Sequence, residues 1–208
     1  MSGPLFVIFR NNSFICWMSD RISPSFFRFH EISDMPNIPF YHHIWSDFIK
    51  YKRSFSKFFR NELIGKSWAG MILKSNTYVA IPDDMLEFEK ALTTEFFMQT
   101  CSRKVYLKPE CLLLAPQEED YISISRTCRM TILSYIQAGD IEERLYLANE
   151  DYSIEEIEMY IAELLAGREW KGLPIYLNGE DLEQYQELGT WIEPKNILKN
   201  YINLIRGV

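Results

Sequence analysis

Four carboxylates lie close together at the start of a predicted helix and are the first candidates for chemistry. They are Asp83, Asp84, Glu87 and Glu89. Such a group could hold a metal ion or supply a general acid and a general base. A carboxylate at a helix start more often faces water, where it caps the helix and favours its dipole. We therefore expect Asp83 and Asp84 to cap a helix over residues 85–99, and we assign the group no catalytic role.

The histidines and cysteines do not complete a metal site or an activated nucleophile. The histidines are His30, His42 and His43, and the cysteines are Cys16, Cys101, Cys111 and Cys128. Adjacent histidines on a helix point about 100° apart, no two cysteines have C-x-x-C spacing, and His30 lacks the second histidine of a zinc protease motif. We predict no catalytic residue, no metal and no cofactor, and free, mostly buried thiols of a reducing compartment.

The composition describes a globular chain with unevenly distributed charge. Hydrophobic residues fill 47% of the 208 positions, which excludes a disordered chain, and the length fits one or two domains. The net charge of −7 lowers the expectation of a nucleic-acid-binding protein. Residues 1–110 carry a net +3 and residues 111–208 a net −10, so the two halves could steer a charged partner.

No segment predicts a targeting signal or a membrane span. The apolar run at residues 4–9 has no basic residues before it and ends at Arg10, too early for a signal peptide. No apolar run approaches the roughly 18 residues of a transmembrane helix. We expect a soluble, cytoplasmic protein.

The hydrophobic pattern predicts α/β elements in two successive groups. The first group has a hairpin at 5–18, an irregular stretch at 19–40, a helix at 41–63 ending at Gly65, strands at 71–73 and 78–81, a helix at 85–99 and a strand at 104–107. The second group has a short helix at 109–114, a strand pair at 121–136, a strand at 141–147, a helix at 153–167, a strand at 173–177, a turn at 178–179 and a helix at 194–206. This order favours two small mixed-sheet lobes, at 1–110 and 111–208, either separate or joined as one compact unit.

Residues 79–115 combine a strand that ends at Pro82, a helix with the pair Glu89–Lys90, and a second strand through Tyr106. This order resembles, without a gap, a segment of the bacterial actin-like, MreB-type rod-shape-determining proteins. The remaining matches are Arg103, Val105, Leu107, Glu110 and Ala115, and a weaker match over 175–182 keeps Gly179 and Leu182. The resemblance implies a reduced actin-like, ribonuclease H-like scaffold of two α/β lobes with flanking helices.

The nucleotide-binding motifs of that superfamily do not carry over. Its first hairpin presents D-x-G-T, and its second D-x-G-G-G-T, to phosphate and magnesium. Here these places read Phe9-Arg10-Asn11-Asn12 and Ser123-Ile124-Ser125-Arg126-Thr127-Cys128. Side chains there block the approach of backbone amides to phosphate, and no carboxylate remains to hold the ion. The resemblance therefore implies a pseudo-ATPase, although Arg10, Arg126 and Arg129 could still bind an anion.

Two charged helix faces are the candidate partner-binding surfaces. The helix at 44–63 carries phenylalanines on one side and the basic residues Lys50, Lys52, Arg53, Lys57 and Arg60 between them. The helix at 153–167 exposes Glu155, Glu156, Glu158 and Glu163. The basic side could meet an acidic partner, an anionic membrane face or nucleic acid, and the acidic side could meet a basic protein. For both, the plain alternative is the solvated side of a core helix.

These observations favour a non-catalytic protein-interaction or assembly module that does not hydrolyse ATP. Its partners would be one or several proteins of a bacterial assembly, self-association is compatible with it, and no nucleic acid is expected. The alternative is an acidic immunity or inhibitor protein that neutralises a single toxin enzyme by direct binding. A catalytic role comes third, because no acid, base and nucleophile follow from the spacing of residues.

Overall fold

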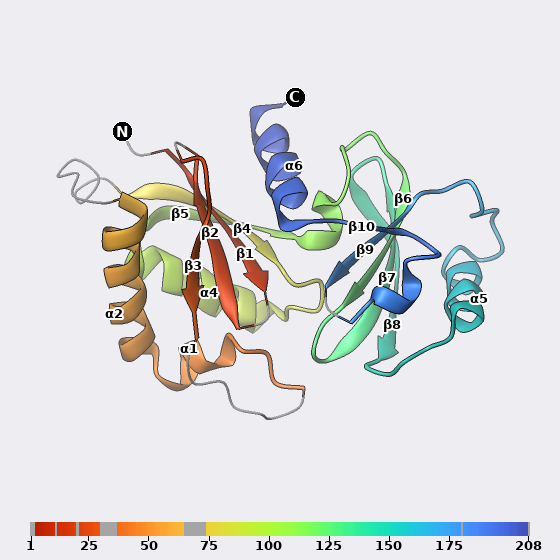
Figure 1. Cartoon of the computed structure of the whole chain (residues 1–208), viewed down its shortest axis with the longest axis horizontal. Coiled ribbons are helices and arrows are strands. Elements are labelled where there is room, and N and C mark those ends of the chain that lie inside the picture. Colours follow the sequence, from red (N-terminus) through yellow and green to blue (C-terminus); the bar gives the residue numbers. More distant parts are fainter. Residues whose placement is uncertain are drawn as a thin grey trace. The chain divides into compact units, whose positions relative to one another are not determined.

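The computed structural model describes residues 3–10, 12–19, 21–29, 37–64, 74–179 and 181–207. The contacts divide the chain into two units. Unit 1 consists of Met1–Ile81 and Met85–Lys108, and unit 2 of Pro82–Asp84 and Pro109–Val208. Each unit contains one five-stranded sheet and its own hydrophobic core (Figure 1).

Unit 1 is a mixed sheet with helices packed on one face. Its strands are β1 (Leu5–Arg10), β2 (Ser13–Met18), β3 (Ser25–Arg28), β4 (Ser75–Ile81) and β5 (Ser102–Pro109), in the spatial order β3-β2-β1-β4-β5. Its helices are α1 (His42–Ser46), α2 (Phe48–Phe58), the π-helical continuation η1 (Phe59–Ile64) and α4 (Glu87–Thr100). Strands β1, β2 and β3 are antiparallel neighbours, while β4 runs parallel to β1.

Phenylalanines form the core between this sheet and helices α2 and α4. Strand β1 is buried at five successive positions, as a central strand must be, while β2 alternates buried and half-buried residues. Phe55 of α2 is fully buried, and its ring lies 5.3 and 5.5 Å from those of Phe96 and Phe97 of α4. Aromatic pairs contribute roughly 0.5–1.5 kcal/mol each beyond area burial, so these rings hold α2 against α4.

Unit 2 is a second mixed sheet. Its strands are β6 (Tyr121–Arg126), β7 (Met130–Gln137), β8 (Asp140–Ala148), β9 (Ile175–Gly179) and β10 (Thr190–Trp191), in the order β10-β9-β6-β7-β8. Its helices are α5 (Ile154–Leu164) and α6 (Pro194–Arg206), with 3-10 turns η2 (Glu110–Leu113) and η3 (Glu183–Tyr185). Helix α5 begins with a capping box of Ser153 and Glu156 and buries Ile157 and Ile161 in the core of this unit.

The two sheets share one connectivity. In each, three antiparallel strands are followed by a helical segment, and the fourth strand returns parallel to the first with the fifth outside it. A parallel return requires a crossover connection, which α1 and α2 supply in unit 1 and α5 supplies in unit 2. The prediction of an α/β chain with two mixed-sheet lobes and flanking helices is confirmed.

Several predicted elements differ from the structure. Strand β3 lies in the stretch predicted to be irregular, and the two-residue strand β10 has no counterpart in the prediction. The predicted helix at 41–63 is interrupted at Asp47, whose side chain accepts a hydrogen bond from the Lys50 backbone and so begins α2. The predicted turn at 178–179 is the end of β9. The strand at 71–73 and the helix stop at Gly65 lie outside the described residues.

The cysteines are free, as predicted. Cys16, Cys101 and Cys111 are buried and Cys128 is exposed. Burial raises the pKa of the three buried thiols above that of an ordinary cysteine, so they behave as small apolar residues. Within the described part of the chain, no helix combines the length and apolar character needed to cross a bilayer.

Replacing Phe55 by alanine tests the core of unit 1. We expect Phe55→Ala to lower the free energy of unfolding by about 3–5 kcal/mol, because it empties a fully buried ring site. Ile49→Ala on the same helix is the matched control, since the Ile49 side chain is 62% exposed, and it should cost less than about 0.5 kcal/mol. Urea unfolding followed by circular dichroism measures both, and equal losses would contradict the assignment of the core face of α2.

Candidate functional site

The basic residues predicted on the first charged helix lie on α2 and η1, on the side away from the core. Lys50, Arg53, Lys57 and Arg60 are exposed, and Lys52 is half-buried. Lys52 Nζ donates to Gln99 Oε1 of α4 at 2.7 Å, and Arg60 Nε donates to the Ser56 carbonyl at 3.2 Å. Both of these groups therefore already support the helices. Lys50 Nζ lies 5.5 Å from the centroid of the Tyr51 ring.

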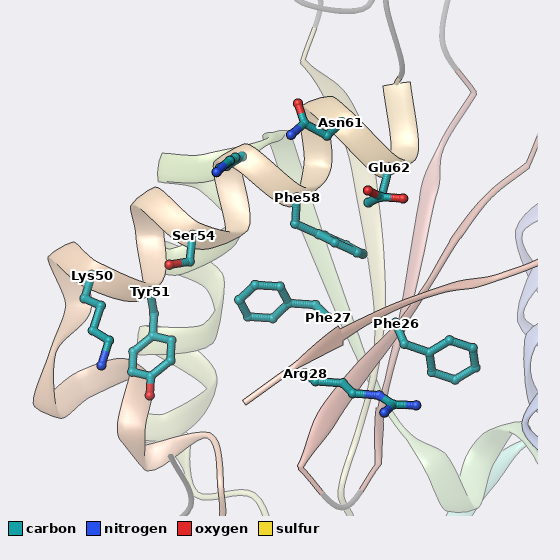
Figure 2. A pocket seen from close by; sticks show the side chains of 10 residues that line it. Phe26, Phe27, Arg28, Lys50, Tyr51, Ser54, Phe58, Asn61 and Glu62 are labelled. Carbon is teal, nitrogen blue, oxygen red and sulfur yellow. The ribbon is translucent and has the colours of Figure 1, made fainter. Parts of the chain in front are cut away.

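A groove of about 530 Å³ lies between this helix and strand β3, all within unit 1 (Figure 2). The helical wall includes Lys50, Tyr51, Lys57 and Glu62, and the strand wall includes Phe26 and Arg28. Figure 2 shows Phe27 turned toward Phe58 at the base of the groove, and their rings lie 5.4 Å apart. The groove thus has an aromatic floor and two lysines on its helical wall.

The groove divides the predicted basic residues into two sets. Lys50 and Lys57 line it, whereas Lys52, Arg53 and Arg60 do not. Arg28 joins the first set from β3, and sequence reasoning missed it because the strand itself was not predicted. The available signal was the run Ser25-Phe26-Phe27-Arg28 directly after Pro24, since a proline followed by aromatic residues suits an edge strand.

The predicted acidic residues of α5 also lie away from the core. Glu155 and Glu163 are exposed and Glu158 is half-buried. Glu156 is exposed, but its carboxylate accepts a hydrogen bond from the Ser153 backbone at 2.7 Å and completes the capping box. Three of the four glutamates therefore remain as candidate contacts, and the fourth begins the helix.

The turn between β6 and β7, matched above to the second phosphate loop, is filled by its own side chains. Arg126 donates to Asn149 Oδ1 at 2.9 Å, to Asp151 Oδ1 at 2.9 Å and to the Asp181 carbonyl at 3.1 Å. In the other matched turn, between β1 and β2, Arg10 Nη1 donates to the Phe9 carbonyl at 2.6 Å. The arginines expected to be available for an anion thus make contacts within the protein.

Asp83 and Asp84 do not cap α4, which corrects the sequence-based expectation. Both are buried within unit 2. The cap of α4 is formed by Leu86 and Glu89, since the Glu89 carboxylate accepts the Leu86 N–H at 2.8 Å. Glu89 is itself buried and contacts His42 Nε2 at 2.7 Å. The prediction that these carboxylates face water at a helix start is therefore wrong for Asp83, Asp84 and Glu89.

Asp84 forms a buried ion pair with Arg129. Arg129 Nε donates to Asp84 Oδ2 at 2.6 Å, and Thr127 Oγ1 donates to the same oxygen at 2.8 Å. The Asp84 side chain is 1% exposed and that of Arg129 15%. A buried charge that lacks a partner is costly, so this pair ties the β6–β7 turn to residues 82–84.

Asp83 occupies an adjacent polar cluster. Its carboxylate accepts hydrogen bonds from the Cys111 backbone at 2.9 Å and from Ser125 Oγ at 2.7 Å. Arg144 donates to the Asp83 carbonyl at 3.2 Å and to Cys111 Sγ at 3.1 Å. The cluster brings together residues from four separate segments, and it holds structure rather than presenting an open acid–base pair.

Within the described ranges, which omit His30, no three histidine, cysteine or carboxylate side chains converge on a possible metal position. His42 and His43 are both half-buried, and the partner of His42 is Glu89.

The end of β9 requires glycine. Gly179 has φ +122°, and a Cβ atom there would lie 2.2 Å from the Arg126 carbonyl oxygen of the neighbouring strand β6. The parallel register pairs these two residues directly. Gly179 therefore allows β9 to lie against β6 at the β6–β7 turn.

Comparisons with known proteins find similarity in structure and not in sequence. No protein-family model matches the chain, and no curated protein matches it. MreB5 of Spiroplasma citri bound to AMPPNP has a TM-score of 0.60 at 8% identity, over 99% of this chain and 98% of that one. The ethanolamine utilization protein EutJ from Carboxydothermus hydrogenoformans has a TM-score of 0.53 at 12% identity, over 94% of this chain and 86% of that one. The filament structure of AlfA from B. subtilis plasmid pLS32 has a TM-score of 0.50 at 11% identity, over 91% of each chain.

The chain has the actin-like fold. Its neighbours are actin-like proteins, and the same strand order occurs twice in the chain. The resemblance of residues 79–115 to the MreB-type family is confirmed at the level of fold. At 8%, 12% and 11% identity, the fold is what the similarity establishes.

Removing the carboxylate of Asp84 tests the buried ion pair. Asp84→Ala should lower the free energy of unfolding by about 3–5 kcal/mol, because Arg129 would keep its charge in a buried position. Asp151→Ala is the matched control, since it also removes an arginine partner, but its side chain is 78% exposed, and it should leave the unfolding midpoint almost unchanged. Urea titration of both variants gives the comparison, and similar effects would contradict a buried pair.

A pair of glycine substitutions tests the close approach of β9 to β6. Gly179→Ala should cost about 3 kcal/mol or more, because strain and the clash with the Arg126 carbonyl add. Gly167→Ala also stands at positive φ, but nothing lies within 4 Å of the position that its new Cβ atom would take, so roughly 1 kcal/mol is expected from the backbone alone. Thermal unfolding measures the two variants, and a Gly179→Ala loss no larger than the control would refute the contact.

Proposed function

We propose that this protein is a non-catalytic protein-interaction or assembly module on an actin-like scaffold, which binds other proteins and does not hydrolyse ATP. The observation that carries the proposal is the β6–β7 turn. Arg126, Thr127 and Arg129 fill it, and each donates hydrogen bonds to protein acceptors.

Phosphate recognition in such a turn needs backbone amides that can approach the ligand and a carboxylate that can hold magnesium. The solved MreB5 and AlfA structures contain AMPPNP. In this chain, the nearby carboxylate of Asp84 already accepts Thr127 and Arg129. A nucleotide would have to displace a buried ion pair before it could recruit that group, which is why we propose an actin-like protein without ATP turnover.

The interaction half of the proposal rests on the charged helix sides. The basic residues of α2 and η1 and the acidic residues of α5 give the chain surfaces of opposite sign, which suit charged protein partners. Since the AlfA structures are filaments, self-association belongs to the same proposal. The buried free thiols fit a reducing compartment, in agreement with a cytoplasmic site of action.

The alternative of an acidic immunity protein rests on the small size of the chain, its net charge of −7 and its acidic second half, which includes the glutamates of α5. It predicts a single basic toxin as partner, whereas an assembly module predicts several subunits of one machine. Affinity purification of the tagged full-length chain distinguishes them, because stoichiometric recovery of one toxin enzyme would favour the inhibitor.

A calorimetric titration tests the absence of nucleotide chemistry. We expect no heat of binding when magnesium–ATP or magnesium–AMPPNP is added to the full chain, because the side chains of Arg126 and Arg129 fill the turn and Asp84 is already paired. A nucleotide-binding actin-like protein titrated in the same buffer is the control. Magnesium-dependent binding in the micromolar range or tighter would overturn this part of the proposal.

A further inference from the structure

The groove between β3 and α2 lies along an open strand edge. Among the described strands of unit 1, β3 is the edge of the sheet, with β2 as its neighbour on one side. The Phe29 N–H donates to the Asn12 carbonyl at 2.7 Å across the β2 side. Backbone groups alternate in direction along an antiparallel strand, so those of Phe27 face β2 as well, and those of Phe26 and Arg28 face the open edge.

Such an edge can accept a further strand. Unpaired N–H and C=O groups give affinity to an incoming extended peptide, and the flanking side chains give specificity. Here the flanking side chains include Phe26, which is 50% exposed, and the cations of the helical wall. The aromatic floor at Phe27 and Phe58 offers apolar contact along the same line.

The charge of the groove selects the incoming segment. Among the described residues of its helical wall, Lys50 and Lys57 are cations and Glu62 is an anion, so positive charge exceeds negative charge there. Lys50 and Lys57 are seven residues apart, which is about two helical turns, so they stand in one row along the groove. An extended segment places every second side chain on one face, so acidic residues at alternate positions would follow this row.

We propose that the β3–α2 groove binds an extended acidic segment of a partner protein, which adds as a strand to the open edge of β3. The proposal rests on the proposed function as a protein-interaction module and names the partner chemistry of one of its surfaces. Alternate backbone groups of the segment pair with Phe26 and Arg28. Its acidic side chains meet Lys50 and Lys57, and its apolar side chains pack near Phe26.

Fluorescence anisotropy with a labelled seven-residue peptide of alternating glutamate and valine tests this on the full chain. We expect saturable binding, with Lys57→Glu weakening it by at least about tenfold, because an attraction becomes a repulsion in the groove. Arg53→Glu makes the same charge change on an exposed residue of the same helix that does not line the groove, and it should change affinity less than about twofold. Equal losses in the two variants would overturn the proposal.

The strand pairing has its own test. N-methylation of the peptide at alternate backbone nitrogens should abolish binding in one register and spare it in the other, because only one set of amides faces β3. A lysine–valine peptide of equal length should not bind. Binding that survives both patterns of N-methylation, or that the lysine peptide matches, would overturn strand addition. Arg28→Glu is a second variant for the case in which Lys57→Glu fails to fold, as judged by its melting temperature.

Failure of this inference is distinguishable from failure of the proposed function. If the Lys57→Glu chain recovers the same partner proteins as the wild type and neither binds magnesium–ATP, the groove proposal is wrong and the interaction module stands. If the chain binds magnesium–ATP, the proposal that it does not hydrolyse ATP is in conflict with that result, while the peptide assay still tests the groove. The remaining candidate for the groove is a second copy of this chain, and sedimentation velocity tests for it. A dimer that the acidic peptide does not affect and that Lys57→Glu abolishes would assign the edge of β3 to a second copy. That result would overturn the proposal.

Discussion

The parallel pairing of the first and fourth strands is the constraint on which each sheet depends. A parallel neighbour can be reached only through a crossover, so a helical segment must connect the third strand to the fourth and cover one face of the sheet. In unit 1 this segment is α1 and α2, and Phe55 anchors α2 to the core. The basic side of α2 is thereby turned outward beside the edge strand β3. The location of the groove follows from the topology of the sheet rather than from any local feature of the helix.

In unit 2 the same pairing determines the chemistry of the β6–β7 turn. The register aligns Gly179 with Arg126 so closely that no side chain fits on the first residue. The Arg126 side chain donates hydrogen bonds to Asn149 and Asp151, and the nearby Arg129 donates to Asp84. The side chains of this turn are thus committed to contacts within unit 2, while the strand order of the sheet is the same as in unit 1.

The sequence predicts those features that local rules decide. The capping box at Ser153, the proline that begins α6 and the alternation of β6 and β7 each correspond to an observed element. The wrong prediction that Asp83 and Asp84 cap a helix has a different origin. Their position suits a helix cap, but their partners Cys111, Ser125, Thr127 and Arg129 lie 28 to 45 residues away in the chain. Long-range pairing of buried charges overrides the local preference of aspartate for a helix cap, and no local sequence pattern predicts such pairing.

The groove between β3 and α2 also could not be predicted from local sequence patterns. Helical periodicity alone divides the cations of α2 and η1 into rows, because Lys50 and Lys57 are separated by seven residues, as are Arg53 and Arg60. Nothing in that spacing says which row faces a sheet edge. The answer depends on β3, whose four residues are too few to give a clear alternating pattern. A strand this short is defined by its pairing with β2, so the surface that it forms with α2 becomes visible only when both partners are in place.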